Sequence, residues 1–307
     1  MTKKKKQQYR IRNWKEYNKA LVQRGSLTLW IDTRCLNAWL DCSCPARRGR
    51  RRTYTDAAIL SALLLREVYH LSLRSTQGLL HSMLRVMQMK LPAPHYSTLC
   101  RRARSLRLCL AQPQKVSHLV IDSSGLKLYG EGEWKVRLHG ADKRRSWRKL
   151  HLAMDARTHQ LTAALITEKE RLDRTVLPLL LDGTEAEIEA VCADGAYDFA
   201  GCYQALKERA ARPLIPPRSD AVVRAKSPFE QRDKNLRLIN KLGRKQWKLK
   251  SGYHRRSLIE TAFFRLKTIF SDKLKSRTAE RQQTEARVRC LALNRMTKLG
   301  MPKSYAI

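Results

Sequence analysis

Apolar positions recur at helical spacing in the first third of the chain. The stretch 55–68 carries apolar side chains three or four residues apart, and it begins with a threonine, a residue type that caps helices. A second stretch, 73–87, keeps an apolar side and a polar side. Two prolines follow it, and Ser97 then favours the cap of a third, short helix over 98–108. The pattern predicts three short helices before residue 112.

The pattern changes after Pro113, where short and nearly continuous apolar runs alternate with longer helical stretches. The runs predict strands at 116–121, 134–138, 149–155, 161–166, 188–193 and 213–215, and the longer stretches predict helices at 173–181 and 199–211. A polar, basic stretch at about 216–252 has no strong periodicity and is interpreted as an insertion before a last amphipathic helix. Alternating strands and helices favour a mixed α/β sheet.

These patterns divide the chain into a helical domain over 1–112 and an α/β domain over 113–307 that carries the basic insertion. Three short helices with an arginine-rich last member are typical of a helix-turn-helix module. On that last helix we expect DNA contacts from Arg101, Arg102 and Arg104. The alternative is an ordinary helical bundle whose basic face touches only backbone phosphates.

Lys and Arg outnumber Asp and Glu by 63 to 27, which gives the chain a formal charge of +36. Basic residues run along the whole chain and include an arginine run at 47–52, so a polyanion is the expected partner, and nucleic acid is favoured. A membrane surface is the competing polyanion, but no apolar run approaches the roughly 20 residues that span a bilayer. The N-terminus has no apolar segment behind its lysines, and the eight cysteines are scattered. We therefore expect a cytoplasmic protein with reduced thiols.

Two aspartates stand where buried strands are predicted to end. Asp122 and Asp194 each follow an apolar run and precede small residues. If the two strands are neighbours, both carboxylates emerge at one edge of the sheet, and Glu260 from a helix packed there adds a third. Three carboxylates so close would repel one another unless divalent cations neutralised them. Two Mg²⁺ ions suit such a site and suit in-line displacement at phosphorus.

The helix around Glu260 places cations beside this carboxylate. Arg256, Glu260 and Lys267 stand at i, i+4 and i+11, so they point to the same side of a helix. Cations on either side of a metal-holding carboxylate can hold phosphates. The alternative is a surface helix with an ordinary Arg–Glu pair, and each aspartate alone fits a turn or a helix cap.

Other acidic residues compete for the role of metal ligand. Asp155, Asp173 and Asp198 all lie near the predicted strands. We expect Asp198 to cap the helix that follows it and Asp155 to begin a turn. His139 and His151 flank a basic loop and are interpreted as structural residues or phosphate contacts rather than as a general base.

Three motifs in order then resemble those of a known family. Segments 121–126 and 193–198 hold the two aspartates, and Tyr253, Arg256, Glu260 and Lys267 follow the pattern Tyr-x2-Arg-x3-Glu-x6-Lys. Together they resemble the DDE triad and signature of bacterial insertion-sequence transposases. The further segments 130–137, 143–151 and 294–302 narrow the resemblance to the insertion-sequence-five family, in its nine-zero-three subgroup. The similarity runs from about Asn13 to Pro302.

The resemblance implies a ribonuclease H-like (retroviral integrase-like) catalytic domain behind a helical, helix-turn-helix-like DNA-binding domain. It implies Mg²⁺-dependent, or Mn²⁺-dependent, cleavage and joining of DNA at the terminal inverted repeats of a mobile element. The implied metal ligands are Asp122, Asp194 and Glu260. The implied DNA contacts are Arg256 and Lys267 on phosphates and Tyr253 against the duplex.

The implied partners are double-stranded DNA, as inverted repeats and as target, and at least one further copy of the chain, because two element ends must be joined. The implied location is the nucleoid of a bacterial cytoplasm, with no membrane contact. Two alternatives stay open on the sequence. One is a catalytically silent DNA-binding repressor derived from a transposase, and the other is a hydrolytic nuclease of the same fold.

Overall fold

The computed structural model describes residues 9–41, 53–128, 147–218, 220–223 and 229–307. The arginine run at 47–52, the strand predicted at 134–138 and His139 lie outside the described residues. Contacts divide the chain into two compact units, Met1–Leu99 with Ala292–Ile307, and Cys100–Leu291. The boundary expected at residue 112 stays a prediction.

The first unit is helical apart from one small sheet. Its helices are α1 (Trp14–Gln23), α2 (Leu27–Trp30), α3 (Thr33–Asn37), α4 (Asp56–Val68) and α5 (Leu73–Val86). The side chain of Thr55 accepts the amide of Ala58 at 3.3 Å and caps α4, while Ser72 caps α5. Strands β1 (Tyr9–Ile11) and β10 (Ser304–Ala306) pair antiparallel. The helices predicted at 55–68 and 73–87 are thereby confirmed.

Two helices contribute residues to both units, α6 (Tyr96–Ser105) and α12 (Ala279–Leu299). The prediction placed the first of them at 98–108. It begins earlier because the Gln77 side chain accepts the backbone amide of Tyr96 at 2.9 Å. It ends earlier because the following leucines are buried at every second position, which is not a helical spacing. No prediction covered the second helix.

The second unit contains a six-stranded mixed sheet in the order β5-β4-β3-β7-β8, with β9 on the end of β3. The strands are β3 (Leu119–Leu128), β4 (Trp147–Asp155), β5 (Leu161–Glu168), β7 (Ala190–Cys192), β8 (Arg212–Leu214) and β9 (Lys273–Leu274). β4 pairs antiparallel with both β3 and β5. β7 and β9 pair in parallel with β3, and β8 pairs in parallel with β7. A separate parallel pair joins β2 (Lys115–Val116) to β6 (Glu187–Ile188).

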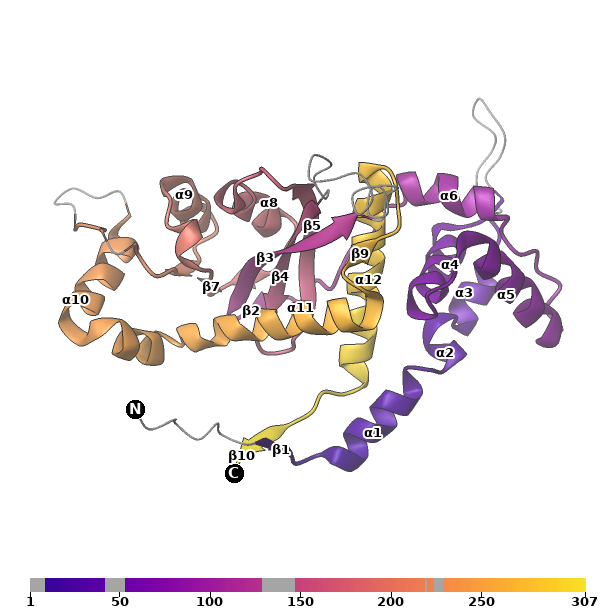
Figure 1. The fold of residues 1–307 in the computed structure, drawn as a ribbon, viewed down its shortest axis with the longest axis horizontal. Helices are drawn as coiled ribbons and strands as arrows, with labels where there is room; N and C mark the ends of the chain where they lie inside the picture. Colours follow the sequence, from indigo (N-terminus) through magenta and orange to yellow (C-terminus); the bar gives the residue numbers. More distant parts are fainter. Residues whose placement is uncertain (1–8, 42–52, 129–146, 219, 224–228) are drawn as a thin grey trace, which may run out of the picture. The chain divides into compact units, whose positions relative to one another are not determined.

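Helices cover both faces of this sheet (Figure 1). On one face lie α8 (Leu177–Asp182) and α9 (Ala200–Glu208), and on the other lies α11 (Ser257–Phe270). The core on the α8 and α9 face is apolar and includes Ile121, Ala153, Ala163, Val191, Leu177, Leu181, Cys202 and Leu206. Side chains alternate along a strand, so the neighbours of Ile121 point to the α11 face. Asp122 therefore faces α11.

The structure corrects the predicted strand ends. Asp122 does not end its strand, because β3 continues to Leu128 and pairs with β4 through Asp122 opposite Leu152. The run predicted as one strand at 188–193 is two pieces, because β6 pairs with β2 while β7 pairs with β3. Asp194 does follow the end of β7, and it opens a short 3-10 turn, η2 (Gly195–Tyr197).

The structure also corrects the stretch predicted to lack a regular element. It contains α10 (Glu230–Ser251), with a kink at Gly243, where φ is 79°. A 3-10 turn, η3 (Tyr253–Arg256), then leads directly into α11. The predicted helix at 173–181 is likewise divided, into a 3-10 turn η1 (Asp173–Thr175) and α8.

Candidate active site

Three elements of the second unit bring three carboxylates together. Asp122 projects from β3 toward α11, Asp194 opens η2 after β7, and Glu260 lies in the first turn of α11. Asp194 and Glu260 both act electrostatically on Asp122 and raise its pKa. The structure therefore groups the three acidic residues that the sequence singled out.

The guanidinium group of Arg256 joins two of these carboxylates. One terminal nitrogen donates to Oδ2 of Asp122 at 2.8 Å, and the other donates to Oε1 of Glu260. Arg256 ends η3, one helical turn before Glu260, so a single backbone segment sets both contacts. In this arrangement the arginine neutralises part of the negative charge of the site.

The Asp122 side chain is only 19% exposed, whereas that of Glu260 is 56% exposed. Burial raises the pKa of the Asp122 carboxyl above its usual range, and the neighbouring carboxylates add to that effect. The amide of Ser123, which donates to Oδ1 at 2.8 Å, and the Arg256 guanidinium oppose it. The ionised form of Asp122 thus depends on nearby positive charge.

Lys267 lies on the same side of α11 as Glu260, as predicted, and reaches β3. Its ammonium donates to Oγ of Ser124 at 2.7 Å. Ser124 is two positions after Asp122, so the two side chains share one face of the strand. Burial lowers the pKa of Lys267. The sequence does not single out Ser124, because a serine within an Asp-Ser-Ser-Gly stretch is indistinguishable from a turn residue.

Tyr253 is buried, with only 7% of its surface exposed. Its ring packs on Trp247 of α10, with centroids 5.5 Å apart, and Ile239 completes this small core. Burial raises the pKa of Tyr253 to about 12. The contact of this residue with DNA stays a prediction.

Comparison with known proteins matches residues 113–295 to the family described as Transposase DDE domain. Residues 22–131 match a second family with the same description. The first match covers more than half of the 307 residues. The chain belongs to the DDE transposase family. Enzymes of this family transfer phosphoryl groups and use divalent metal ions.

Among solved structures, the chain is similar to one titled Drosophila P element transposase strand transfer complex. The similarity covers 52% of this chain and 37% of that one, at 14% identity and a TM-score of 0.28. The chain therefore spans little more than a third of the length of that transposase.

The carboxylates fit a divalent metal by their chemistry. Among the described residues, no group of three His, Cys, Asp or Glu side chains is arranged to hold a metal ion. In this structure Arg256 bonds to an oxygen of Asp122 and to an oxygen of Glu260. All three groups nevertheless offer hard carboxylate oxygens, the donors that Mg²⁺ and Mn²⁺ prefer. Burial, and then the charges of Asp194 and Glu260, raise the pKa of Asp122, so a nearby cation would help to keep this carboxyl ionised.

The three α6 arginines lie on another element. Arg101 and Arg104 are exposed, and Arg102 is partly buried. Arg104 forms an exposed ion pair with Glu280 at 3.6 Å. Their contacts with DNA stay a prediction, as does the helix-turn-helix role of the N-terminal helices.

The competing carboxylates have structural partners. Asp155 accepts the amide of Arg157 at 3.0 Å and the hydroxyl of Thr158 at 2.6 Å, which confirms that it begins a turn. The expected helix cap at Asp198 is wrong, because Phe199 precedes α9 and no side-chain cap forms there. Asp173 pairs with Lys149 at 3.0 Å.

Asp198 instead ties three segments together. Its carboxylate accepts the hydroxyl of Tyr203 at 2.8 Å, the amide of Arg218 at 2.9 Å and the guanidinium of Arg232 at 2.9 Å. These donors come from α9, from the segment after β8, and from α10. Despite burial, they hold the pKa of Asp198 below its usual range. Because Asp198 directly follows η2, this network anchors the turn that begins at Asp194.

His151 is structural, as predicted. It is fully buried, and Nε2 lies 2.9 Å from the hydroxyl oxygen of Thr167. Burial lowers its pKa to about 4, although Asp173 partly opposes this shift. The imidazole is therefore neutral near pH 7.

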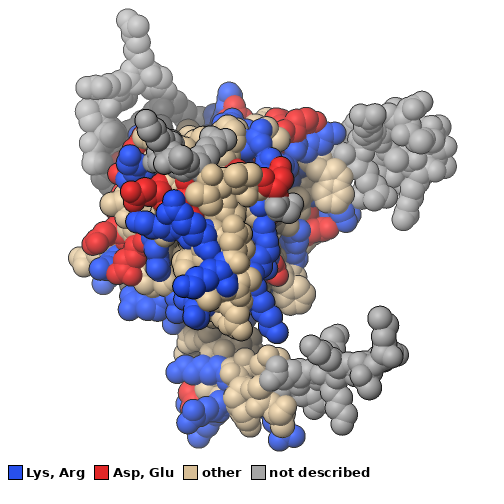
Figure 2. Space-filling view, turned by 90° about the vertical axis from the view of Figure 1, so that its left-hand side faces the viewer, with Lys and Arg blue, Asp and Glu red and all other residues tan. Residues whose placement is uncertain are grey.

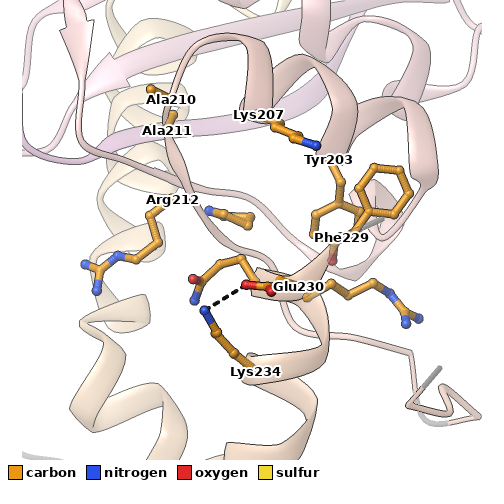
Figure 3. A pocket seen from close by; sticks show the side chains of 11 residues that line it. Tyr203, Lys207, Ala210, Ala211, Arg212, Phe229, Glu230 and Lys234 are labelled. Carbon is orange, nitrogen blue, oxygen red and sulfur yellow. Dashed lines mark hydrogen bonds and ion pairs between the residues drawn. The ribbon is translucent and has the colours of Figure 1, made fainter. Parts of the chain in front are cut away.

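A pocket of about 640 Å³ lies between α9, β8 and α10 (Figure 3). Its wall includes Tyr203, Phe229, Lys207 and Arg232, and an ion pair between Glu230 and Lys234 crosses its rim. None of the three grouped carboxylates lines it. It is thus separate from the candidate active site.

Lys and Arg side chains are prominent on the face of the molecule that carries α10 (Figure 2). The exposed cations of this helix are Lys234, Arg237, Lys241, Arg244, Lys245, Lys248 and Lys250. No helix among the described residues is long and apolar enough to cross a bilayer. The surface of α10 is suited to a polyanion.

Proposed function

We propose that this chain is a transposase that binds the terminal inverted repeats of an insertion sequence and catalyses Mg²⁺-dependent DNA cleavage and strand transfer. The observation that carries the proposal is the grouping of Asp122, Asp194 and Glu260, the first and last of which bond to one guanidinium group, in a chain of the DDE transposase family. Cleavage and joining of DNA strands by in-line displacement at phosphorus uses divalent metal ions, which carboxylates can hold.

The sheet order supports a ribonuclease H-like catalytic domain. In this sheet three antiparallel strands lie next to strands that pair in parallel, and Asp122 lies on the central strand, β3. The motifs quoted from the sequence support the insertion-sequence-five family and its nine-zero-three subgroup. The helices before residue 112 are proposed to form the helix-turn-helix-like DNA-binding part, with Arg101, Arg102 and Arg104 on DNA.

Asp122, Asp194 and Glu260 would hold the metal ions. When bound, the metal supplies charge neutralisation at phosphate and activation of the attacking oxygen. Arg256 and Lys267 bind DNA phosphates beside the cut, and Ser124 orients the ammonium of Lys267. Tyr253, packed on Trp247, fixes the position of η3 and with it Arg256. The partners are double-stranded DNA and at least one further copy of the chain on that DNA.

The first prediction tests the triad. Asp122→Asn, Asp194→Asn and Glu260→Gln each should abolish cleavage of inverted-repeat DNA while leaving its binding largely intact, because an amide keeps the shape and loses the charge that holds a metal. Glu187→Gln, at an exposed carboxylate on β6, is the matched control and should cut like wild type. Cleavage is measured on gels and binding by mobility shift, with Ca²⁺ in place of Mg²⁺.

The outcomes separate the three candidate functions. Joined product from the wild type supports a transposase, whereas cut but never joined DNA indicates a hydrolytic nuclease. Binding without cutting at any Mg²⁺ or Mn²⁺ concentration indicates a silent repressor. Full cleavage by any one of the three variants removes that residue from the triad.

A further inference from the structure

Helix α10 carries a run of positive charge that no acidic residue interrupts. Its first turn contains Glu230 and Asp233, but the remaining residues, 234–251, include no Asp or Glu. The same stretch holds seven Lys and Arg side chains, all of them exposed. The surface of α10 is therefore strongly cationic (Figure 2).

Most of these cations have no partner in the protein. Within the part of the chain that the structure describes, four of them form no hydrogen bond, ion pair or ring contact: Arg237, Lys241, Lys245 and Lys250. The other three each have one contact, with Glu230, with the carbonyl of Pro217 or with the ring of Tyr253.

The arginines of α12 differ from these side chains. Arg281 donates to the carbonyl of Cys100 at 3.0 Å. The buried Arg289 pairs with Glu285 and donates to the carbonyl of Lys273 at 2.9 Å. Where an arginine holds this fold together, the structure thus supplies an acceptor. None of the four α10 side chains meets such an acceptor in the described ranges, so their charge has no structural use there.

The spacing of the α10 cations opposes helix formation. Arg237 and Lys241 stand at i and i+4 before the kink at Gly243, and Lys245 and Lys248 stand at i and i+3 after it. Like charges at these spacings are neighbours on a helix and destabilise it. A bound polyanion would remove this repulsion. The charge pattern is therefore accounted for by a ligand and not by the fold.

Both ends of α10 are fixed within the second unit. Near its start, Arg232 pairs with the buried Asp198, and near its end Trp247 packs on Tyr253 of η3. η3 packs against α10 and leads directly into α11. The cations thus lie on a fixed segment that continues into the candidate active site. This continuity favours DNA as the polyanion.

We propose that α10 binds the phosphate backbone of the DNA duplex on which the candidate active site acts, through contacts that do not depend on base sequence. Lys and Arg side chains on phosphates release counterions whichever bases lie between them. A membrane surface fits less well, because three large apolar side chains of α10, Leu236, Ile239 and Trp247, are buried in the protein. The inference rests on the proposed function, since it adds an interface with the DNA substrate of that same site.

The test compares two double variants of the full chain. Arg237→Gln with Lys241→Gln removes two unpartnered cations of α10. Arg157→Gln with Lys207→Gln is the matched control and removes one exposed Arg and one exposed Lys elsewhere in the second unit. Binding to a DNA duplex of arbitrary sequence is measured in a chelator over a salt series, and stability is measured as the urea midpoint.

The α10 variant should reduce the slope of log K against log salt by about 1.8, at about 0.9 for each phosphate contact. Its urea midpoint should be unchanged or higher, because a like-charge pair is removed. Lys245→Gln, a single change after the kink, should reduce the slope by about 0.9. The control variant should bind the duplex like wild type.

An unchanged slope in the α10 variants overturns the inference. An equal reduction in the control variant also overturns it, because the effect then belongs to net charge and not to α10. A lower urea midpoint for the α10 variant would mean that these side chains hold the fold. Phosphatidylserine vesicles that bind the wild type more tightly than the duplex does, and lose this binding in the α10 variant, would assign the helix to a membrane instead.

Cleavage of inverted-repeat DNA separates this inference from the proposed function. If the wild type cuts that DNA and the α10 variants keep the wild-type slope, the inference is wrong and the proposed function stands. If the wild type never cuts it and the α10 variants lose slope, the contact between α10 and DNA stands and the proposed function fails.

Discussion

Arg256 connects two of the carboxylates that the proposed function assigns to metal. Its guanidinium bonds to Asp122 and Glu260 from the end of η3. A guanidinium delivers one positive charge, whereas a divalent ion delivers two, so exchange of one for the other deepens the neutralisation at Asp122. Under the proposed function, an arginine displaced in this way would be free to bind a DNA phosphate.

His151 gives the molecule a predictable response to acid. Its pKa is about 4 in the fold and 6.5 ordinarily, so the unfolded chain takes up a proton at a higher pH than the folded chain does. The stability contributed by neutral His151 is fully present above pH 6.5 and is lost as the pH falls toward 4. The shift corresponds to about 3 kcal/mol.

His151→Gln should remove this pH-dependent part of the stability, because glutamine keeps a hydrogen-bonding group near Thr167 and does not titrate. The free energy of unfolding is measured in urea from pH 7.5 to 4 for both proteins. The wild type should lose about 3 kcal/mol more than the variant over that range. Parallel curves for the two proteins would show that His151 titrates normally in the fold.

The Asp198–Arg232 pair links α10 to the turn that begins at Asp194. Asp198 is nearly inaccessible, and the Arg232 side chain is 19% exposed. Arg232→Ala leaves a buried carboxylate short of its cation and should cost about 3 kcal/mol. Amides at the start of α10 and in η2 should then exchange hydrogen faster.

Lys234→Ala is the control on the same helix. Lys234 pairs with Glu230 at 3.0 Å, but both side chains are largely exposed. An exposed pair of this kind contributes at most about 0.5 kcal/mol. Hydrogen exchange followed by mass spectrometry compares the two variants. If the α10 amides are equally protected from hydrogen exchange in the two variants, the Asp198 network does not hold the helix in place.

Helices with regular apolar spacing and a capping residue were predictable from the sequence. α4 and α5 satisfy both conditions, and their caps at Thr55 and Ser72 form in the structure. α10 was not predictable, because its buried residues are few among many cations and Gly243 interrupts them. Its position depends on long-range contacts such as Trp247 on Tyr253. Tertiary packing of this kind leaves little trace in local spacing.

Strand ends were less predictable for a related reason. The run after Ile121 contains Asp, Ser, Ser and Gly, which favour a turn. In the structure these residues continue the ladder with β4, where Ser124 lies opposite Leu150. Pairing with a distant strand outweighs local turn preference. The grouping of Asp122 with Asp194 and Glu260 was nonetheless expected, since it depends on which strands are neighbours and not on where each one ends.

The charge of the whole chain predicts strong salt dependence of DNA binding. A formal charge of +36 favours release of counterions from DNA at many contacts. Arg101→Ala should weaken binding to inverted-repeat DNA and reduce the slope of log K against log salt by about 0.9. Base reading would add a loss of about 1–3 kcal/mol and relaxed specificity at one base pair.

Mobility-shift titrations over a salt series, on inverted-repeat and scrambled DNA, measure both effects. Glu187→Gln serves again as the control, since it changes an exposed charge on β6. Uniform weakening on both DNA sequences would make α6 a phosphate contact rather than a reader of bases. An unchanged slope would remove Arg101 from the interface.

The contact between Arg256 and Asp122 joins positions that are 134 residues apart in the chain. At about 5–20 residues per second, a ribosome adds Arg256 about 7 to 27 s after it adds Asp122. A chain that is still being made has β3 but lacks α11, so its Asp122 has neither the arginine nor Glu260 beside it. Under the proposed function, a chain can cut DNA only once its synthesis has passed α11.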